Sequence, residues 1–331
     1  MKKTISLLLC LLLAVGSLPF SVLADTSDNV SFPTGLKAPT TYIDFNNKTA
    51  ENRVGGQNGE IVGDALFIRS ADGSMALHLE NAFGKNAKQY LKLPGATLGD
   101  ADFTVSLMYR ASGEGGFTEW AGKWMSTAEE KKFKGFESAQ VKAGGAIFST
   151  ADTAITPNRG VSLLNLPSCT DGTLLLSDGT NEANKNAISN IQDTNWHSLV
   201  LSVKRGNTAQ LYLDGKVYAS VGISGVSGSM DGDGTLNFGA DGLGNYGVGS
   251  GDFDNIAVFS YALNEAEVAS YTARDLYAKE IEMAKGALSK ARIGSRFSAK
   301  MIREFSKTVA DAENQLGNTA TDLVAARTAL K

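Results

Sequence analysis

Short runs of alternating apolar and polar residues constrain this chain most, and they extend from about Thr41 to Val258. Clusters of Gly, Asn, Asp and Ser separate the runs, as turns separate strands. In one run, alternate positions carry large apolar side chains that would share one face of a strand, namely Phe103, Val105, Leu107 and Tyr109. The stretch from His197 to Val203 alternates in the same way. This region is therefore predicted to be all β.

One hairpin is visible in the sequence. Only Asp214 and Gly215 stand between the apolar runs 209–213 and 216–219. Both residue types suit the positive φ angles of a type I′ turn. We therefore expect two antiparallel strands joined by a two-residue turn.

The pattern becomes helical after Tyr261, where Ala, Glu, Lys and Arg dominate and glycine becomes rare. Two stripes have helical spacing, Tyr277, Ile281, Ala284, Leu288 and Ala291 in the first helix and Ile302, Phe305, Val309, Ala312 and Leu316 in the second. Ser298 is a candidate N-cap, and Gly317 would follow the end of the second helix. A third helix should begin near Thr319. Such stripes form either the core of a small antiparallel bundle or a docking face for partner domains or surface proteins.

The first residues are typical of a secretory signal peptide. Lys2 and Lys3 precede an apolar run from Ile5 to Val15, and Ala24 ends a small-residue cleavage site. Removing 1–24 leaves 29 basic and 35 acidic residues, a net charge of −6 (29 − 35), with no basic patch for nucleic acid. Cys169 is then the single cysteine, so no intramolecular disulfide can form. We expect a secreted or cell-surface protein with no transmembrane segment after cleavage.

A series of ordered motifs resembles the laminin-G-like (LamG) domains of bacterial extracellular proteins. The motifs are Trp196 to Val200, Leu211 to Lys216, Leu236 to Gly239, Gly251 to Phe259 and Ala262 to Val268, with Tyr42 to Phe45 and Tyr90 to Pro94 fitting the first strands. The resemblance implies a concanavalin A-like antiparallel β-sandwich (jelly roll) over 41–273, after a linker at 25–40. It also implies that the first and last strands are adjacent. A polar insert between Gly113 and Gly144 departs from compact members of the family.

The C-terminal region 274–331 resembles the three-helix FIVAR modules of bacterial surface proteins and polysaccharide-acting enzymes. The matching elements are Ile281 to Leu288, Phe297-Ser298 and Ala312 to Leu330. Phe297 stands where the family usually has tyrosine. The predicted fold is therefore a mainly β jelly roll followed by a small C-terminal α-helical bundle.

The arrangement of acidic and histidine residues predicts no catalysis. Retaining glycosidases of this fold place carboxylates on alternate residues of one strand, about 5 Å apart, and no such run occurs in the β region. The two histidines, His78 and His197, are isolated in the sequence, and we interpret His197 as a packing residue. Trp196 is expected in the core.

Calcium is a cofactor that the laminin-G resemblance implies. Asp44 on the first strand and Asp254 on the last would be ligands of a structural Ca²⁺, with loop carbonyls completing the shell. The alternative is that both acids cap strand ends or hydrogen-bond turns. The run 231–234 is either a fragment of a calcium loop or a plain turn.

Loop aromatics are the predicted sugar-binding residues, because an aromatic face stacks on a pyranose ring. Trp120 and Trp124 lie in the polar insert, and Tyr246, Asn245 and Asp241 lie in the glycine-rich stretch 239–251. Alternatively, the tryptophans pack with Phe117, Phe133 and Phe136 as a satellite core.

The predicted function is lectin-like recognition or adhesion, without chemistry, of an extracellular polysaccharide or glycoconjugate. Two alternatives stay open at this point. The chain could be the accessory portion of a polysaccharide-degrading glycoside hydrolase, or a cell-surface structural spacer.

Overall fold

A computed structural model gives the fold. It describes residues 30, 32–70, 73–81, 84–85, 87–96, 98, 100–111, 146–151, 159–164, 171–189, 195–232, 234–244, 246–247, 251–293, 297–318 and 322–330. The predicted signal peptide, Cys169 and the insert 113–144 lie outside these residues. None of the helices in the described part is both long enough and apolar enough to cross a membrane.

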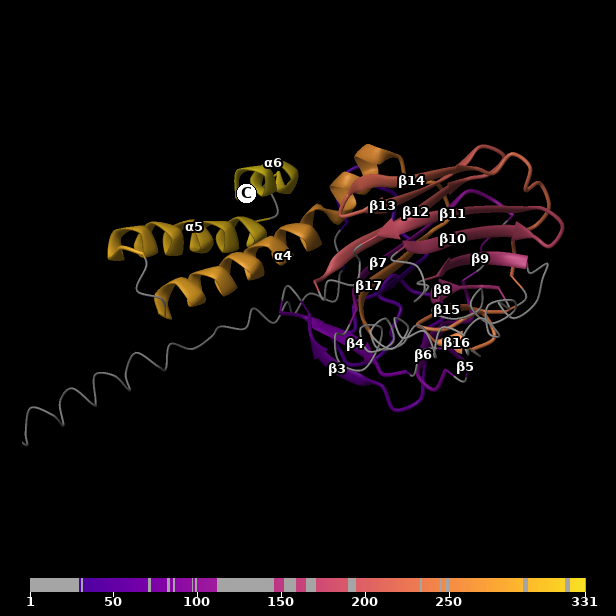
Figure 1. The fold of residues 1–331 in the computed structure, drawn as a ribbon, viewed down its shortest axis with the longest axis horizontal. Coiled ribbons are helices and arrows are strands. Elements are labelled where there is room, and N and C mark those ends of the chain that lie inside the picture. The colour runs from indigo at the N-terminus through magenta and orange to yellow at the C-terminus, as the bar shows by residue number, and fades with distance from the viewer. Residues whose placement is uncertain are drawn as a thin grey trace, which may run out of the picture. The chain divides into compact units, whose positions relative to one another are not determined.

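Two antiparallel sheets form a β-sandwich, which confirms the predicted fold class (Figure 1). Among the described residues, the larger sheet has eight strands, seven of them in the order β14 (Lys216–Gly222), β13 (Thr208–Leu213), β12 (His197–Lys204), β7 (Phe103–Ala111), β17 (Gly251–Phe259), β4 (Met75–Leu79) and β3 (Leu66–Arg69), with β1 (Thr41–Ile43) also paired to β17.

The second sheet has seven strands within the described part of the chain. Their order is β11 (Glu182–Ser189), β10 (Asp171–Asp178), β9 (Arg159–Leu164), β8 (Ala146–Ser149), β15 (Leu236–Phe238), β6 (Tyr90–Leu93) and β2 (Glu60–Val62). A short pair, β16 (Tyr246–Gly247) and β5 (Gly84–Lys85), lies outside both sheets. The main hydrophobic core draws its side chains from strands of both sheets.

The predicted strand faces are confirmed. Phe103, Val105, Leu107 and Tyr109 of β7 all point into the core between the sheets, as do alternate residues of β12. Residues on the other face of both strands are buried as well, because helical residues cover part of that face. The alternation in sequence therefore marks which residues enter the main core, although most residues on both faces of these strands are buried.

The predicted hairpin also forms. Asp214 and Gly215 have φ angles of 51° and 79°, and Leu213 pairs with Lys216 across the turn. Glycine at 215 meets a second demand, because a Cβ there would lie 3.2 Å from Thr272 Oγ1 and 3.4 Å from Leu276 Cδ1 of the following helix. The hairpin tip is thus pressed against the helical region.

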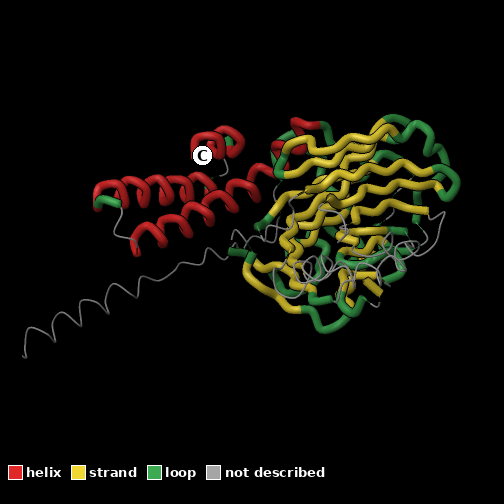
Figure 2. Tube along the Cα trace, viewed as in Figure 1, coloured by secondary structure: helices red, strands yellow, loops and turns green. Residues whose placement is uncertain are grey.

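Three helices follow the sandwich (Figure 2). They are α4 (Glu265–Ile293), α5 (Ala299–Gly317) and α6 (Leu323–Leu330). Ser298 caps α5 as predicted by accepting a hydrogen bond from the Met301 N–H. Gly317 is the last residue of α5 rather than the residue after it, and α6 begins later than expected, at a cap made by Asp322.

Helix α4 is continuous through positions 273 and 274, so one helix joins the two predicted regions. Its first turns cover the outer face of the eight-stranded sheet, where Val268 and Tyr271 are buried with residues of β12, β13 and β17. The ring of Tyr271 meets Phe259 edge-on, with centroids 5.1 Å apart, and burial raises the pKa of Tyr271 well above its ordinary value.

Polar contacts add to this junction. Asn255 on β17 donates from Nδ2 to Asp275 Oδ1 of α4 at 2.9 Å, and Lys279 Nζ lies 3.4 Å from Asp214 Oδ2 at the hairpin tip. Burial would raise the pKa of Asp214, but a hydrogen bond from His197, the charge of Lys279 and the Ser198 N–H together lower that pKa below its ordinary value. Asp214 is therefore held as a carboxylate between sheet and helix.

The apolar stripes of the helices form their own core. Tyr277, Ile281 and Ala312 are buried together, with Leu316, Leu323 and Ala326 packed around them. Arg327 of α6 donates from Nε to Glu280 Oε1 of α4 at 2.7 Å. The core interpretation of the stripes is confirmed; a docking role for this region stays a prediction.

Replacing Gly215 with alanine should lower the free energy of unfolding by about 1–2 kcal/mol, because L-residues are disfavoured at positive φ and the new Cβ would crowd α4. Gly225→Ala is the matched control, since Gly225 does not have a positive φ and an added Cβ would meet no atom within 4 Å. Urea unfolding of both variants makes the comparison. Equal midpoints would show that the turn conformation and its contact with α4 contribute nothing.

Candidate functional site

The predicted sugar-binding residues are not brought together by the described part of the structure. Trp120, Trp124 and Asn245 lie outside the described residues, and only the backbone of Tyr246 is described, in β16. Asp241 is fully buried, and its carbonyl oxygen accepts a hydrogen bond from Asn237 Nδ2 at 2.6 Å. A glycan site at these five residues stays a prediction.

The predicted calcium ligands lie where the first and last strands meet, since β1 pairs with β17 as expected. Asp44 accepts from the Asn46 N–H and lies 3.6 Å from the Arg53 guanidinium. Asp254 is fully buried and accepts from the Asn255 N–H at 2.8 Å and from Ser74 Oγ at 3.3 Å.

In each of these contacts the aspartate is the hydrogen-bond acceptor or the anion of an ion pair. Nowhere in the described ranges do three or more His, Cys, Asp or Glu residues gather as metal ligands. In the run 231–234, Gly232 and Gly234 pass so close to Thr150 and Gly242 that a Cβ at either would meet a backbone oxygen at 2.1 Å. Calcium at Asp44 and Asp254 stays a prediction from the resemblance.

A polar row crosses the outer face of the eight-stranded sheet, on the side away from the main core. Asp252 of β17 pairs in register with Arg110 of β7 on one side and with His78 of β4 on the other. Trp196 directly precedes β12, whose His197 lies opposite Tyr109, so Trp196 stands beside Arg110. Three strands distant in sequence, together with the residue that precedes β12, thus place four chemically distinct side chains in one line.

Asp252 organises this row. Its side chain is only 2% exposed, and Oδ2 accepts from Arg110 Nε while Oδ1 lies 2.6 Å from His78 Nδ1. When Asp252 is ionised it only accepts hydrogen bonds, and His78 is then the donor of this pair through Nδ1. With both oxygens engaged, Asp252 is a counterion and a positioning group rather than a free acid or nucleophile.

Arg110 is fixed from two directions. Its Nε donates to Asp252 at 2.6 Å, and its guanidinium carbon lies 5.0 Å from the centroid of the Trp196 ring. Trp196 itself is 6% exposed and packs with Ala76, Met108 and Ile68, which confirms its predicted place in a core. Stacking on an aromatic face and pairing with a carboxylate hold a guanidinium in one orientation.

A groove of about 290 Å³ opens over this row, with helix α4 as its second wall. Arg110, Trp196 and Asn195 line it from the sheet side, Arg69 and Ser70 from the end of β3, and Lys279, Glu282 and Met283 from α4. The three helical residues are spaced i, i+3 and i+4, so they share one helix face. The groove therefore belongs to the sandwich and the helix jointly.

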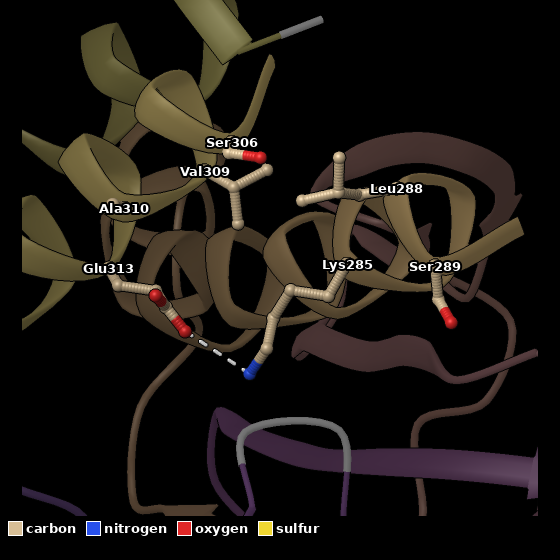
Figure 3. A pocket seen from close by; sticks show the side chains of 7 residues that line it. All are labelled: Lys285, Leu288, Ser289, Ser306, Val309, Ala310 and Glu313. Atoms are coloured by element: carbon tan, nitrogen blue, oxygen red, sulfur yellow. Dashed lines mark ion pairs between the residues drawn. The ribbon is translucent and has the colours of Figure 1, made fainter. Parts of the chain in front are cut away.

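A second cavity, of about 420 Å³, lies between α4 and α5 (Figure 3). Leu288 and Val309 on its walls are already buried, and Lys285 Nζ lies 3.1 Å from Glu313 Oε1 across it. A hydrogen bond to Glu282 raises the pKa of Lys285 further. Because its charges are mutually compensated, this cavity is a gap in the packing of the helices and offers no unpaired charge to a ligand.

Comparison with known proteins places this geometry in a family. A laminin-G-type family model, described as the concanavalin A-like lectin/glucanases superfamily, matches residues 84–269, more than half of the chain. The chain belongs to this superfamily. The match ends in the first turn of α4, so the superfamily model covers Arg110, Asn195 and Trp196 of the groove. It includes neither Arg69 and Ser70 nor the three groove residues of α4. No curated protein matches the chain.

Several solved structures are similar to the sandwich at low identity. The binding domain of Paraclostridial Mosquitocidal Protein 1 has 13% identity and a TM-score of 0.49, covering 70% of this chain and 51% of that one. The botulinum neurotoxin serotype G binding domain has 12% identity and a TM-score of 0.48, covering 76% and 52%. The chain thus spans about half the length of these two domains.

A further similar structure is domain 4 of AbnA, a GH43 extracellular arabinanase from Geobacillus stearothermophilus, in complex with arabinotriose. It has 15% identity and a TM-score of 0.46, and the match covers 70% of this chain and 96% of that chain.

Sequence reasoning missed Arg110, Arg69 and Lys279. The signal available was an arginine at the end of the strand 103–109, on the face opposite the predicted core. Its partner Asp252 lies 142 residues away, and only the strand register brings the two together. His197, which the sequence suggested is a packing residue, lies with its Nδ1 3.0 Å from Asp214 Oδ2 at the junction between the hairpin and α4.

Removing the Asp252 carboxylate should destabilise the fold. Asp252→Ala leaves Arg110 Nε and His78 Nδ1 without their acceptor, and we expect a loss of about 2–3 kcal/mol in the free energy of unfolding. Asp231→Ala, at an exposed aspartate, should change it by less than about 0.5 kcal/mol. Chemical denaturation measures both, and an Asp252→Ala variant as stable as the control would contradict the organising role of this carboxylate.

Proposed function

We propose that this chain is a carbohydrate-recognition module that binds its ligand in the groove between the eight-stranded sheet and α4, without chemistry. The observation that carries the proposal is the set of fixed polar groups around Arg110 in an open groove of a lectin-type sandwich. Sites for small ligands combine a shaped concavity with a few oriented polar groups. Arg110 supplies an oriented group here, and Asn195 and Ser70 add polar residues to the lining.

We propose no chemistry because the acids in and beneath the groove are already engaged with other side chains. Asp252 has both oxygens committed to His78 and Arg110, and Glu282 Oε1 accepts from Lys285 Nζ at 2.6 Å. Glycoside hydrolysis needs one acid that holds a proton and a second that is free to act as nucleophile or base. Neither carboxylate is placed for those roles. The expected ligand is an extracellular polysaccharide or glycoconjugate, reached after export through the predicted signal peptide.

A glycan array with the purified protein tests the function, and a pair of exposed methionines tests the site. Met283 on α4 is 58% exposed and lines the groove, whereas Met301 on α5 is 53% exposed and does not. Met283→Trp should change the affinity for any bound glycan severalfold, because the new ring either fills the groove or stacks on a sugar, and Met301→Trp should leave it unchanged.

Three results would contradict this proposal. Absence of binding to every glycan would reject recognition, and release of reducing sugar from a bound polymer would reject the non-catalytic assignment. Equal affinity of the two methionine variants would place the site elsewhere, with the predicted residues Trp120, Trp124 and Tyr246 as the next candidates.

Calcium at Asp44 and Asp254 is a separate prediction, taken from the laminin-G resemblance. That resemblance predicts that chelation lowers the melting temperature and that added Ca²⁺ restores it, because an ion bound only to the folded state stabilises it. Thermal melts with EGTA, with EGTA plus excess Ca²⁺, and with EGTA plus excess Mg²⁺ make the test. An unchanged melting curve would remove both the ion and the ligand roles of the two acids.

A further inference from the structure

We infer that the glycan bound in this groove is acidic, and that Arg110 holds its carboxylate or sulfate group with help from Arg69 and Lys279. This inference rests on the proposed function, because it names the ligand class of the same site. It goes beyond that function in assigning a charge to the ligand and a direct binding role to helix α4.

Arg110 is prepared for an anion before any ligand arrives. Only its Nε is used by Asp252, and no described residue hydrogen-bonds to its two terminal amino groups. The side chain is 32% exposed, so these donors are within reach of the groove. A planar guanidinium with its outer edge free matches the two oxygens of a carboxylate or sulfate. Because Asp252 and Trp196 already restrict the side chain, little rotamer freedom is left to lose on binding.

Two further cations line the groove from different walls. Arg69 ends β3, and its Nη1 donates to the Gly73 carbonyl at 3.0 Å, while no described carboxylate forms an ion pair with it. Lys279 lies on α4 and is paired with Asp214 at 3.4 Å, with 12% of its side chain exposed, so it presents less free charge to the groove than the two arginines. The acid in the lining, Glu282, is engaged by Lys285 at 2.6 Å. The groove therefore presents more free positive than negative charge.

A neutral sugar would use these donors poorly. Hydroxyl groups form hydrogen bonds of ordinary strength, whereas an anion forms charge-assisted bonds that are roughly twice as strong. Since Arg110 and Arg69 come from the sheet and Lys279 from α4, an anion between them would touch both regions. The continuous α4 is thus a wall of the site as well as a connector.

The test compares ligands that differ only in charge. Oligogalacturonate and its methyl-esterified form share one backbone, and dextran sulfate and dextran share another. Isothermal titration of the full protein at 50 mM and 300 mM NaCl gives each dissociation constant. We expect at least one charged member to bind about tenfold or more tightly than its neutral partner, with affinity falling at higher salt.

Variants locate the charge that matters. Arg110→Ala should lower affinity for the charged ligand about tenfold or more, and Arg110→Lys should recover part of it, because lysine keeps the charge but loses the planar fork. Arg69→Ala and Lys279→Gln keep the test valid if Arg110→Ala fails to fold, and each should lower the affinity severalfold. Lys204→Ala, at an exposed lysine of β12 outside the groove, is the control and should have no effect.

Each outcome decides one of the two claims. If neutral and charged members bind equally, the inference is wrong but carbohydrate recognition still holds. If Lys204→Ala loses as much affinity as Arg110→Ala, the attraction is nonspecific and the inference is also wrong. The inference is supported if a charged ligand binds and only the groove variants weaken that binding. The better ligand of the two, uronate or sulfate, then identifies the source of the anion. Failure of all four polymers and of the glycan array would reject the proposed function itself.

Discussion

Both faces of strand β17 are buried, and most of the structure depends on that constraint. All nine of its residues are shielded from solvent, and it pairs with β1, β4 and β7. Its inner face contributes Phe253, Ile256 and Val258 to the main core. Side chains on its outer face must therefore either be apolar and covered, or be polar and paired with other polar groups. Both arrangements occur on this strand.

The apolar cover lies at one end of the strand and the polar partners lie at the other. At its C-terminal end, Ala257 and Phe259 are covered by the first turns of α4. At its N-terminal end, Asp252 is buried between Arg110 and His78. A bulge separates the two ends, with Asn255 at a φ of 47° as the extra residue. The groove opens above the polar end, where α4 runs on from the apolar end. Because a buried carboxylate without partners is strongly unfavourable, the fold itself keeps Arg110 in place.

The sequence predicted the features that depend on local chemistry. Alternation identified β7 and β12 and their core faces, the Asp214-Gly215 pair identified the hairpin, and Ser298 identified the start of α5. The motifs around β17 also placed the first and last strands side by side. These features depend on side-chain periodicity and on turn preference, which neighbouring residues determine.

The features that the sequence did not predict depend on register between distant strands. Asn255 shifts the parity of β17, so that Phe253 and Ile256 share a face although simple alternation would separate them. The row of His78, Asp252 and Arg110 requires the register of three strands together. Helix α4 forms a wall of the groove because it continues past the predicted domain boundary at 273, and the helical composition of the sequence does not change there. None of these features has a local pattern that periodicity could detect.

Hydrogen exchange with and without a saturating bound glycan tests the central claim most directly, since it reports where the ligand lies without any substitution. We expect slower exchange in peptides covering 195–199, the end of β7 and residues 275–285 of α4, because these segments form the two walls of the groove. Protection confined to 113–144 or 239–251, with no change at the walls, would contradict it.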